Sequence, residues 1–263
     1  MDAVTPDFEG TRTKLVRTTM LLGLVGAVVV GVLVGVLLSW LIGAVVLLVV
    51  GGAWVGFVSL RVKASLDRVL HVTGARRVDA GSEPRWENTV DGLSMSNGIV
   101  DAELWIIESD RANAFAAASA DRTAFVTTTG LLGALGVVEL EAVTANLVGR
   151  VKDGSARYGT VAVGVYGAML GGGRAAQKLA ASLGDQRAIA TDLAAVDLTR
   201  YPPGLAAAFT AIESVGSEVS GVDPVTAHLW LAPVVQADGG VAQPLADTAM
   251  QPLALRIAVL DEL

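Results

Sequence analysis

The segment with the strongest chemical signature is ELEAVTANLVGRVKDG, which runs from Glu139 to Gly154. Its leading half is similar to the start of a helix that carries a catalytic zinc ion. Such a helix needs two histidines four residues apart, because side chains at that spacing share one face, and a glutamate that activates a zinc-bound water. The middle of this segment offers asparagine, leucine and arginine instead. The segment is therefore either a metal-binding helix without its ligands or an ordinary amphipathic helix.

The rest of the sequence offers few other groups for catalysis. The chain has no cysteine, which excludes disulfides, thiolate metal sites and cysteine nucleophiles. Its two histidines, His71 and His228, do not have the spacing of paired metal ligands. The sequence also lacks a G-x-S-x-G motif, which would supply the serine nucleophile of a hydrolase. We expect His228 to be a packed structural residue, although a metal site shared with carboxylates stays open. The glycines of GGGR at residues 171–174 lack the Lys-Ser/Thr ending of a phosphate-binding loop, so we expect a turn.

Residues 18–60 form one run of 43 residues without a charge. A single helix of that length would measure about 65 Å, whereas the hydrocarbon core is roughly 30 Å thick and takes about 20 residues to cross. We therefore predict two transmembrane helices folded back as a hairpin, with the turn near Ser39–Gly43 and Trp40 at an interface. A cleavable signal peptide fits poorly, because the run is too long and lacks a cleavage pattern. Residues 158–173 are apolar but short for a third span, so they lie either at the bilayer surface or inside the domain.

Charge predicts the orientation of the hairpin and the class of partner. Lys14 and Arg17 precede the uncharged run, and five basic residues between 61 and 77 follow it. Both ends of a hairpin face one side, and basic flanks favour the cytoplasm. The alanine, valine and glycine content suggests a bacterium, so we expect a multi-pass inner (plasma) membrane protein with a cytoplasmic C-terminal domain. The basic collar would contact membrane lipid. Residues 78–263 carry 11 basic against 22 acidic residues, which argues against nucleic-acid binding.

Beyond the hairpin the chain predicts a domain of helices with a few strands. Leu140, Val143 and Leu147 stand at helical spacing and predict a helix over the segment described first. β-branched and aromatic residues predict strands at Gly98–Ser109 and Arg122–Gly130. Further elements are expected as a basic helix at 61–77, a connecting loop at Asp79–Ser96, and helices near 185–199, 204–215 and 252–260.

Four short motifs, in their order and spacing, resemble the membrane-anchored zinc metallopeptidases that include the heat-shock protease HtpX and the CAAX-processing proteases. The motifs are Asn113–Ala116 (NAFA), Thr128–Leu132 (TTGLL), Leu140–Val143 (LEAV), and Pro252-Leu253 followed by Arg256-Ile257. The resemblance covers residues 85–263, and the preceding hairpin is similar to the usual anchor of that family. It implies an α+β protein with an N-terminal transmembrane helical hairpin and a mainly helical, zincin-like peptidase domain that contains a small β-sheet.

The implied organisation has four parts. They are a cytoplasmic N-terminal tail at 1–17, the two-helix transmembrane hairpin at 18–60, a basic membrane-proximal linker helix at 61–84 and a peptidase-like domain at 85–263.

The resemblance also places the catalytic positions of the family on this chain. In the family, the helix after Leu-Glu-Ala-Val carries H-E-x-x-H, a later helix carries a third ligand four residues before an aspartate, and a histidine precedes the terminal proline. Laid onto this sequence, these positions are Asn146 and Arg150 for the two helical histidines, Leu147 for the glutamate, Ala188 for the third ligand, Asp192 for the retained aspartate and Met250 for the last histidine.

These exchanges remove the chemistry of a zinc site. Asparagine is a poor zinc ligand, alanine offers no donor atom, leucine cannot take a proton, and arginine stays protonated at physiological pH. A catalytic zinc site keeps three protein ligands and one open position. We therefore expect no metal, no cofactor and no enzymatic activity. The family aspartate orients a ligand histidine, so we expect Asp192 to bond Arg150, Asn146 or both; the alternative is that Arg150 is exposed.

The resemblance therefore predicts an inactive metallopeptidase homologue that acts as a binding, regulatory or scaffolding subunit of a membrane protein complex. A strand containing Phe125, Val126, Thr127 and Thr128 resembles the cleft strand of the family, where an extended segment of another membrane protein would pair with a sheet edge. Two alternatives stay open. One is a residual metal-dependent protease with a remade site, and the other is a structural accessory subunit bound through its transmembrane hairpin.

Overall fold

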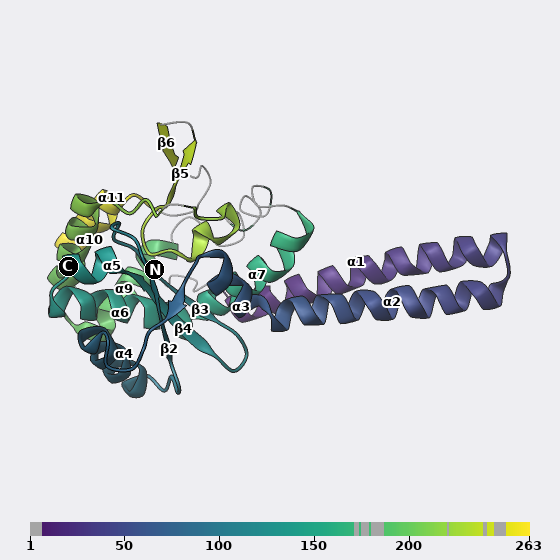
Figure 1. The fold of residues 1–263 in the computed structure, drawn as a ribbon, viewed down its shortest axis with the longest axis horizontal. Coiled ribbons are helices and arrows are strands. Elements are labelled where there is room, and N and C mark those ends of the chain that lie inside the picture. Colours follow the sequence, from purple (N-terminus) through teal and green to yellow (C-terminus); the bar gives the residue numbers. More distant parts are fainter. Residues whose placement is uncertain are drawn as a thin grey trace.

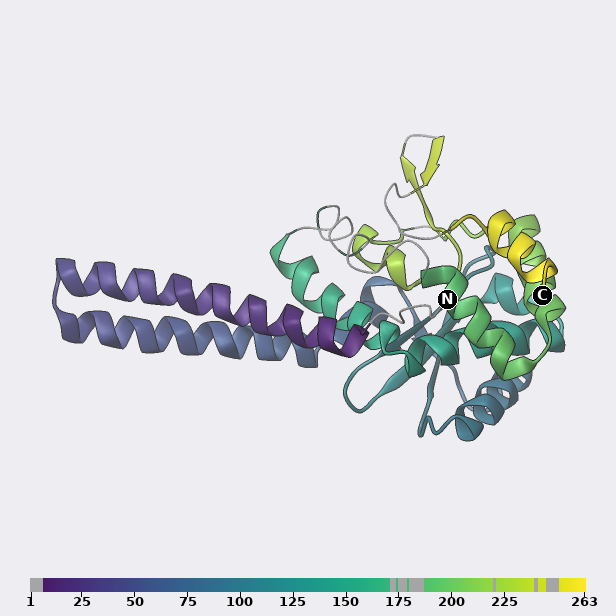
Figure 2. The same ribbon diagram turned by 180° about the vertical axis from the view of Figure 1, so that it is seen from behind.

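The computed structural model describes residues 7–170, 174, 179, 187–219, 221–238, 241–244 and 251–263. Figures 1 and 2 show a long two-helix rod that projects from one end of a rounded domain. The rod consists of α1 (Phe8–Leu37) and α2 (Trp40–Lys63), and the domain combines helices with a four-stranded mixed sheet. The α+β class with an N-terminal hairpin is thus confirmed.

The other elements of the described residues lie in the domain. The first group comprises α3 (Ser65–Val72), β1 (Arg76–Arg77), α4 (Pro84–Ser96), β2 (Glu103–Ile107), β3 (Ala114–Ala118), β4 (Thr123–Thr128) and α5 (Thr129–Ala134). The second comprises α6 (Val137–Lys152), α7 (Ser155–Met169), α9 (Arg187–Thr199), α10 (Pro202–Val215), η1 (Pro224–Leu229), β5 (Val235–Asp238), β6 (Val241–Pro244) and α11 (Leu253–Asp261).

The hairpin has the surface of a membrane-spanning pair. Among the described residues, α1 and α2 are the helices long and apolar enough to cross a bilayer, and only 11% and 17% of their most apolar stretches are buried. A core helix of a soluble protein would instead bury most of such a stretch. The chain reverses at Leu38 and Ser39, and the exposed Trp40 begins α2. Gly31 and Gly43 let the two helices approach so closely that a Cβ on Gly43 would overlap α1.

The hairpin is built into the domain rather than tethered to it. Helix α1 begins at Phe8, so most of the segment expected as a tail at 1–17 is helical. Phe8 is buried, and its ring stacks on that of Tyr158 in α7 with 6.3 Å between centroids. On the other helix, Arg61 Nε donates to the Gly164 carbonyl at 3.0 Å. Helix α7 therefore holds the ends of both membrane helices.

The sheet has the order β1-β2-β4-β3, with β4 parallel to β2 and antiparallel to β3. Because side chains alternate along a strand, each strand contributes to both faces. Ala116 and Phe125 lie in the hydrophobic cluster that contains α6, whereas Phe115 and Val126 lie in the cluster that contains α3 and α7. The sheet is therefore a central layer, buried on both faces, and α6 is held against one of them.

Two expected elements differ from the structure. The basic helix expected at 61–77 is divided, because α2 continues to Lys63, α3 covers Ser65–Val72, and Arg76–Arg77 form β1. The segment Asp79–Ser96 is not a loop, because its residues from Pro84 onward form α4, which begins with proline in the first turn and buries Trp86 and Val90. Residues 158–169 belong to α7, whose side chains up to Val165 are buried in the domain. The alternative of a place inside the domain therefore holds for residues 158–165, and Gly171–Gly173 lie outside the described residues.

Candidate functional site

Helix α6 and helix α9 bring the candidate positions together in the interior. Asn146 and Leu147 on α6 are fully buried and Arg150 is 3% exposed. On α9, Ala188 and Asp192 are buried one turn apart on the side that packs against α6. Helix α6 is buried on all sides from Ala142 to Arg150, and α9 turns Ala188, Thr191, Asp192 and Ala195 inward at helical spacing. Met250, the last position implied by the resemblance, lies outside the described residues.

Asp192 accepts a hydrogen bond from Asn146, as predicted: Asn146 Nδ2 lies 2.8 Å from Asp192 Oδ1. Arg150 is buried, so the alternative of an exposed arginine is wrong. Its guanidinium does not bond Asp192 directly; Arg150 Nε donates to Asn146 Oδ1 at 3.0 Å. Its Nη1 donates to the carbonyl oxygens of Leu229 and Trp230, at 2.8 and 3.0 Å. Asn146 therefore stands between the cation and the carboxylate.

The direct ion partner of Asp192 is Arg256 on α11, which sequence reasoning missed. Arg256 Nε donates to Asp192 Oδ2 and Nη2 donates to Asp192 Oδ1, both at 2.7 Å. Its Nη1 donates to the Leu231 carbonyl at 2.7 Å, and the guanidinium lies 4.2 Å from the centroid of the Phe209 ring. Leu253 is buried on the same face of α11, three residues before Arg256. That helical spacing is the sequence signal that could have placed Arg256 inside.

The centre is rich in buried positive charge. Burial lowers the pKa of Arg150 to about 9, with smaller contributions from Arg187 and Arg256. Burial also lowers the pKa of Arg187 to about 10, which Asp153 opposes. Both guanidinium groups stay charged at neutral pH. Burial raises the pKa of Asp192, and the charge of Arg256 opposes that shift. The guanidinium groups of Arg150 and Arg256 therefore act on the buried carboxylate of Asp192, whereas Asp153 is the carboxylate that acts on Arg187.

The residues present do not fit a divalent metal ion. The amide of Asn146 is used on both sides, since its nitrogen donates to Asp192 and its oxygen accepts from Arg150. Both oxygens of Asp192 accept from Arg256, and Ala188 has no donor atom. Within the described residues no three His, Cys, Asp or Glu side chains converge as a metal site would require. A cation placed here would also meet the guanidinium of Arg150.

His228 is buried beside this centre, as expected of a structural residue. Burial, followed by the positive charge of Arg187, lowers the pKa of His228 to about 3, while backbone groups of Gly159 and Val225 oppose the shift. Arg187 Nη2 donates to the carbonyl oxygen of His228. The imidazole is therefore neutral at physiological pH, and its main-chain oxygen helps to hold a buried cation.

The expected cleft strand offers no edge for a partner. Phe125, Val126, Thr127 and Thr128 lie in β4, which is paired along its length with β2 on one side and β3 on the other. The prediction of an extended segment pairing with this strand is therefore wrong. Strand order, which does not follow the order of strands along the chain, is the reason.

The outer edge of β3 is covered by the chain itself. Leu231 N donates to the Ala114 carbonyl at 2.7 Å, and Trp230 forms a bridge with Phe115 and packs on its ring with 4.9 Å between centroids. At the other end of the strand, Ala118 N donates to Thr160 Oγ1 at 3.1 Å. The segment 229–232 therefore lies where an extended partner of β3 would lie.

Asn113 fixes that covering segment in place. Its Oδ1 accepts from the backbone nitrogen of Ala232 at 3.1 Å, and its Nδ2 donates to the carbonyl oxygens of Ala232 and Ser217, each at 3.1 Å. Asn113 is fully buried. Asn113, the first residue of the NAFA motif, thus holds residues 229–232 in place through hydrogen bonds.

Comparison with known proteins adds an evolutionary context to this geometry. No protein-family model matches the chain. The chain is 28% identical over 195 residues to the Protease HtpX homolog of Tropheryma whipplei, covering 61% of this chain and 67% of that protein. It is 28% identical over 201 residues to the Protease HtpX homolog of Dictyoglomus turgidum, covering 64% of this chain and 66% of that protein.

A third relative matches over a shorter region, at a higher identity. The Protease HtpX homolog of Streptococcus thermophilus is 32% identical over 151 residues, which are 57% of this chain. The match covers 48% of that protein, so the chain spans about half the length of this relative and about two thirds of the other two. The chain is a distant homologue of proteins that carry the name Protease HtpX homolog.

Proposed function

We propose that the protein is a catalytically inactive, membrane-anchored homologue of HtpX-type metallopeptidases that acts as a binding, regulatory or scaffolding subunit of a membrane protein complex. In this proposal the hairpin spans the inner membrane and the domain stands in the cytoplasm, on the side of the basic flanks. The partner is another membrane protein. The domain serves as a rigid, folded body rather than as a protease.

The observation that carries this proposal is the buried network at the positions of the catalytic residues. Arg256, Asp192, Asn146 and Arg150 form a continuous chain of hydrogen bonds across α11, α9 and α6. Each guanidinium also binds carbonyl oxygens of residues 229–231. A site that must hold a zinc ion and a water molecule needs donor atoms and an open position. Here the donor atoms are exchanged and the space is occupied by side chains.

The covered edge of β3 favours binding through surfaces other than a substrate cleft. The hairpin is the largest apolar surface among the described residues, with side chains such as Val36 and Leu48 exposed by 82% and 74%. Without a hydrophobic effect between helices in lipid, close packing through small residues drives association. This supports the alternative of an accessory subunit that binds its partner through the transmembrane hairpin.

Site-specific cross-linking on the full chain tests the proposal. A photoreactive residue is placed at Val36 or Leu48 on the hairpin, or at the exposed Met95 or Val100 on the domain, and the chain is purified from its own membranes. We expect a discrete membrane protein to cross-link from at least one of these surfaces. The surface that reacts separates binding through the hairpin from binding through the domain. Absence of any discrete adduct from all four positions, together with metal-dependent proteolysis, would refute the proposal.

A further inference from the structure

A pocket of about 500 Å³ opens where the two membrane helices enter the domain. Its walls come from the first turns of α1, the end of α2, the loop between β3 and β4, and α7. Four cationic side chains line it, one from each of these segments: Arg12, Lys63, Arg122 and Arg157. Asp121 is the acidic residue of the lining. Segments far apart in the sequence thus bring positive charge to one place at the base of the rod.

The pocket lies at the depth of lipid headgroups. The uncharged run ends at Thr18 on α1 and at Leu60 on α2. At 1.5 Å per helical residue, Arg12 lies about 9 Å and Lys63 about 5 Å beyond those ends. The polar layer on each side of the hydrocarbon core is roughly 5 to 8 Å thick. A lipid in the leaflet next to the domain would therefore present its phosphate at the level of Lys63, within reach of the long side chain of Arg12.

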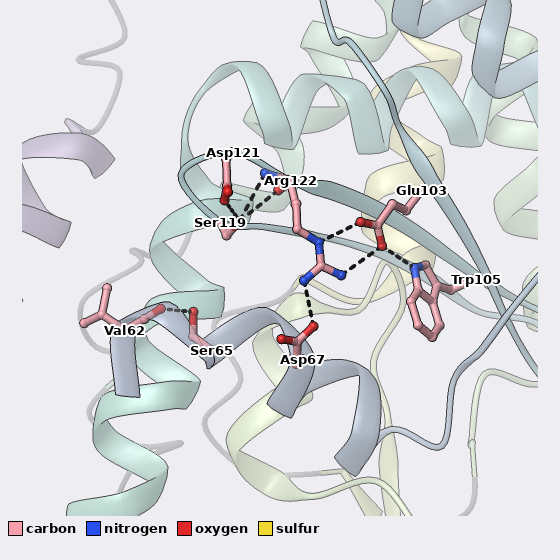
Figure 3. A network of polar contacts seen from close by, with 8 residues as sticks. All are labelled: Val62, Ser65, Asp67, Glu103, Trp105, Ser119, Asp121 and Arg122. Carbon is pink, nitrogen blue, oxygen red and sulfur yellow. Dashed lines mark hydrogen bonds and ion pairs between the residues drawn. The ribbon is translucent and has the colours of Figure 1, made fainter. Parts of the chain in front are cut away.

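Arg122 is held in place by carboxylates and does not add free charge. Figure 3 shows its guanidinium between Glu103 and Asp67, with both contacts at 2.7 Å. Hydrogen bonds to Glu103 raise the pKa of Arg122 above its ordinary value. In the same view Ser119 donates to Asp121 Oδ1 at 2.9 Å, which shapes the loop at the pocket wall. Arg122 therefore forms a fixed wall, and the charge available to a ligand comes from the other three cations.

Those three cations are only partly neutralised. Glu9 lies 2.8 Å from Arg12 and 3.5 Å from Arg157, so one carboxylate serves two guanidinium groups. A guanidinium has five N–H donors, which leaves most donors of both arginines free. Within the described residues Lys63 has no carboxylate partner. With Arg122 included, the four cations stand against Glu9, Asp67, Glu103 and Asp121, so the positive charge that a phosphodiester would meet is concentrated on Lys63.

We propose that this pocket binds the phosphodiester headgroup of an anionic phospholipid from the leaflet next to the domain. The arginines supply paired donors for phosphate oxygens, and Lys63 supplies the uncompensated positive charge. Val62 and Val161 line the same pocket and offer apolar surface to the glycerol backbone. This inference rests on the membrane-anchored state in the proposed function.

Lipid retention by the full chain in mild detergent provides the test. The protein is titrated with phosphatidylglycerol or phosphatidylcholine, and bound lipids are counted by native mass spectrometry. We expect a preference of at least about fivefold for phosphatidylglycerol, and Lys63→Gln lowers its retention by roughly fivefold, as one cation at a membrane surface would. Asp121→Asn removes the acidic residue of the lining and raises retention by a similar factor. Because poor folding would lower lipid retention rather than raise it, this increase tests the proposal even if other variants fold poorly.

The matched control is Lys14→Gln, which removes a cation from the same end of α1 but outside this pocket. Retention that falls equally in Lys14→Gln and Lys63→Gln would overturn the proposal in favour of diffuse surface charge. Inorganic phosphate that displaces the lipid at millimolar concentration and binds as well alone would overturn the lipid source. Flotation with phosphatidylcholine vesicles measures separately whether the chain is anchored in a membrane. A chain that floats but shows no lipid preference contradicts only this inference. A chain that does not float contradicts the proposed function.

Discussion

Asp192 on α9 and Arg256 on α11 form an ion pair closed to solvent, with Nε–Oδ2 and Nη2–Oδ1 distances of 2.7 Å and side chains exposed by no more than 3%. By resemblance, this aspartate stands where the metallopeptidase family keeps the residue that orients a zinc ligand. Here it holds a guanidinium instead. The pair joins the two helices around the centre, so at this position the carboxylate contributes to the packing of α9 against α11.

Breaking this pair should destabilise the protein strongly. Arg256→Met lowers the free energy of unfolding by about 3–5 kcal/mol, because it leaves the carboxylate of Asp192 buried without its cation. The double variant Asp192→Asn, Arg256→Met loses less than the sum of the two single variants, since neither charge is then stranded. Denaturant titration of the full chain in detergent measures these energies.

The exposed pair of Arg76 and Glu108 is the control, with side chains 54% and 63% exposed. Arg76→Met changes the free energy of unfolding by no more than about 1 kcal/mol. If Arg256→Met were as mild as Arg76→Met, or if the two buried substitutions were additive, the ion pair would not have the role assigned to it.

The junction between the hairpin and the domain predicts a contrast between two glycines of α7. A Cβ on Gly164 would lie 2.7 Å from Ser65 Cβ and 2.8 Å from the Arg61 carbonyl oxygen, whereas a Cβ on Gly167 would find its nearest neighbour at 3.6 Å, on Val225. Gly164→Ala therefore lowers the free energy of unfolding by about 1–3 kcal/mol. Gly167→Ala is neutral or slightly stabilising, because alanine favours a helix. Thermal unfolding of both variants decides, and equal effects would contradict the close contact of α7 with the end of α2.

The buried histidine predicts a pH dependence of stability. The pKa of His228 is about 3 in the folded chain against an ordinary value of 6.5, so between these values the unfolded chain binds a proton that the folded chain does not. The free energy of unfolding therefore falls as the pH drops below 6.5, by up to about 1.4 kcal/mol per pH unit. His228→Asn flattens this slope between pH 6 and pH 4. A slope that persists in His228→Asn would assign the proton uptake to another group.

The positions of Asn146, Arg150 and Ala188 on the facing helices α6 and α9 predict that substitutions can create a zinc site. Asn146→His, Leu147→Glu, Arg150→His and Ala188→Glu together place two nitrogen ligands on one face of α6 and a carboxylate on the facing helix α9. We expect this quadruple variant to bind stoichiometric zinc, measured by isothermal titration. The triple variant that keeps Ala188 lacks the third ligand, so we expect it to bind zinc far more weakly than the quadruple variant. A folded quadruple variant that takes up no zinc would show that these positions do not converge as described.

The parts of the fold that local pattern controls were predictable from sequence. The uncharged run of residues 18–60 allows only a hairpin at bilayer dimensions, and α1 and α2 follow it. Apolar spacing similarly indicated α6. Helix α4 was missed because its composition is polar and includes Gly92, and its buried face consists of few residues, chiefly Trp86 and Val90. Strand β3 was missed because AFAAA is not rich in β-branched residues; its pairing with β4 decides its state.

The contacts of the candidate site were also predictable only in part. The contact between Asn146 and Asp192 was predictable because the family resemblance assigns both positions to one centre. The contact between Asp192 and Arg256 spans 64 residues of sequence and depends on how α11 packs against α9. The carbonyl oxygens that receive Arg150 depend on the path of residues 229–231, which no local pattern specifies. Long-range packing, rather than residue type, settles these partners.

The most direct test of the account is the metal content of the full chain together with its proteolytic activity. The chain is purified in mild detergent without chelators, analysed by inductively coupled plasma mass spectrometry, and incubated with an unfolded protein substrate. We predict transition-metal content far below one ion per chain, and no cleavage beyond that of an Asn146→Ala, Asp192→Ala variant. A stoichiometric metal ion that is lost in this variant, with cleavage lost in parallel, would contradict the account.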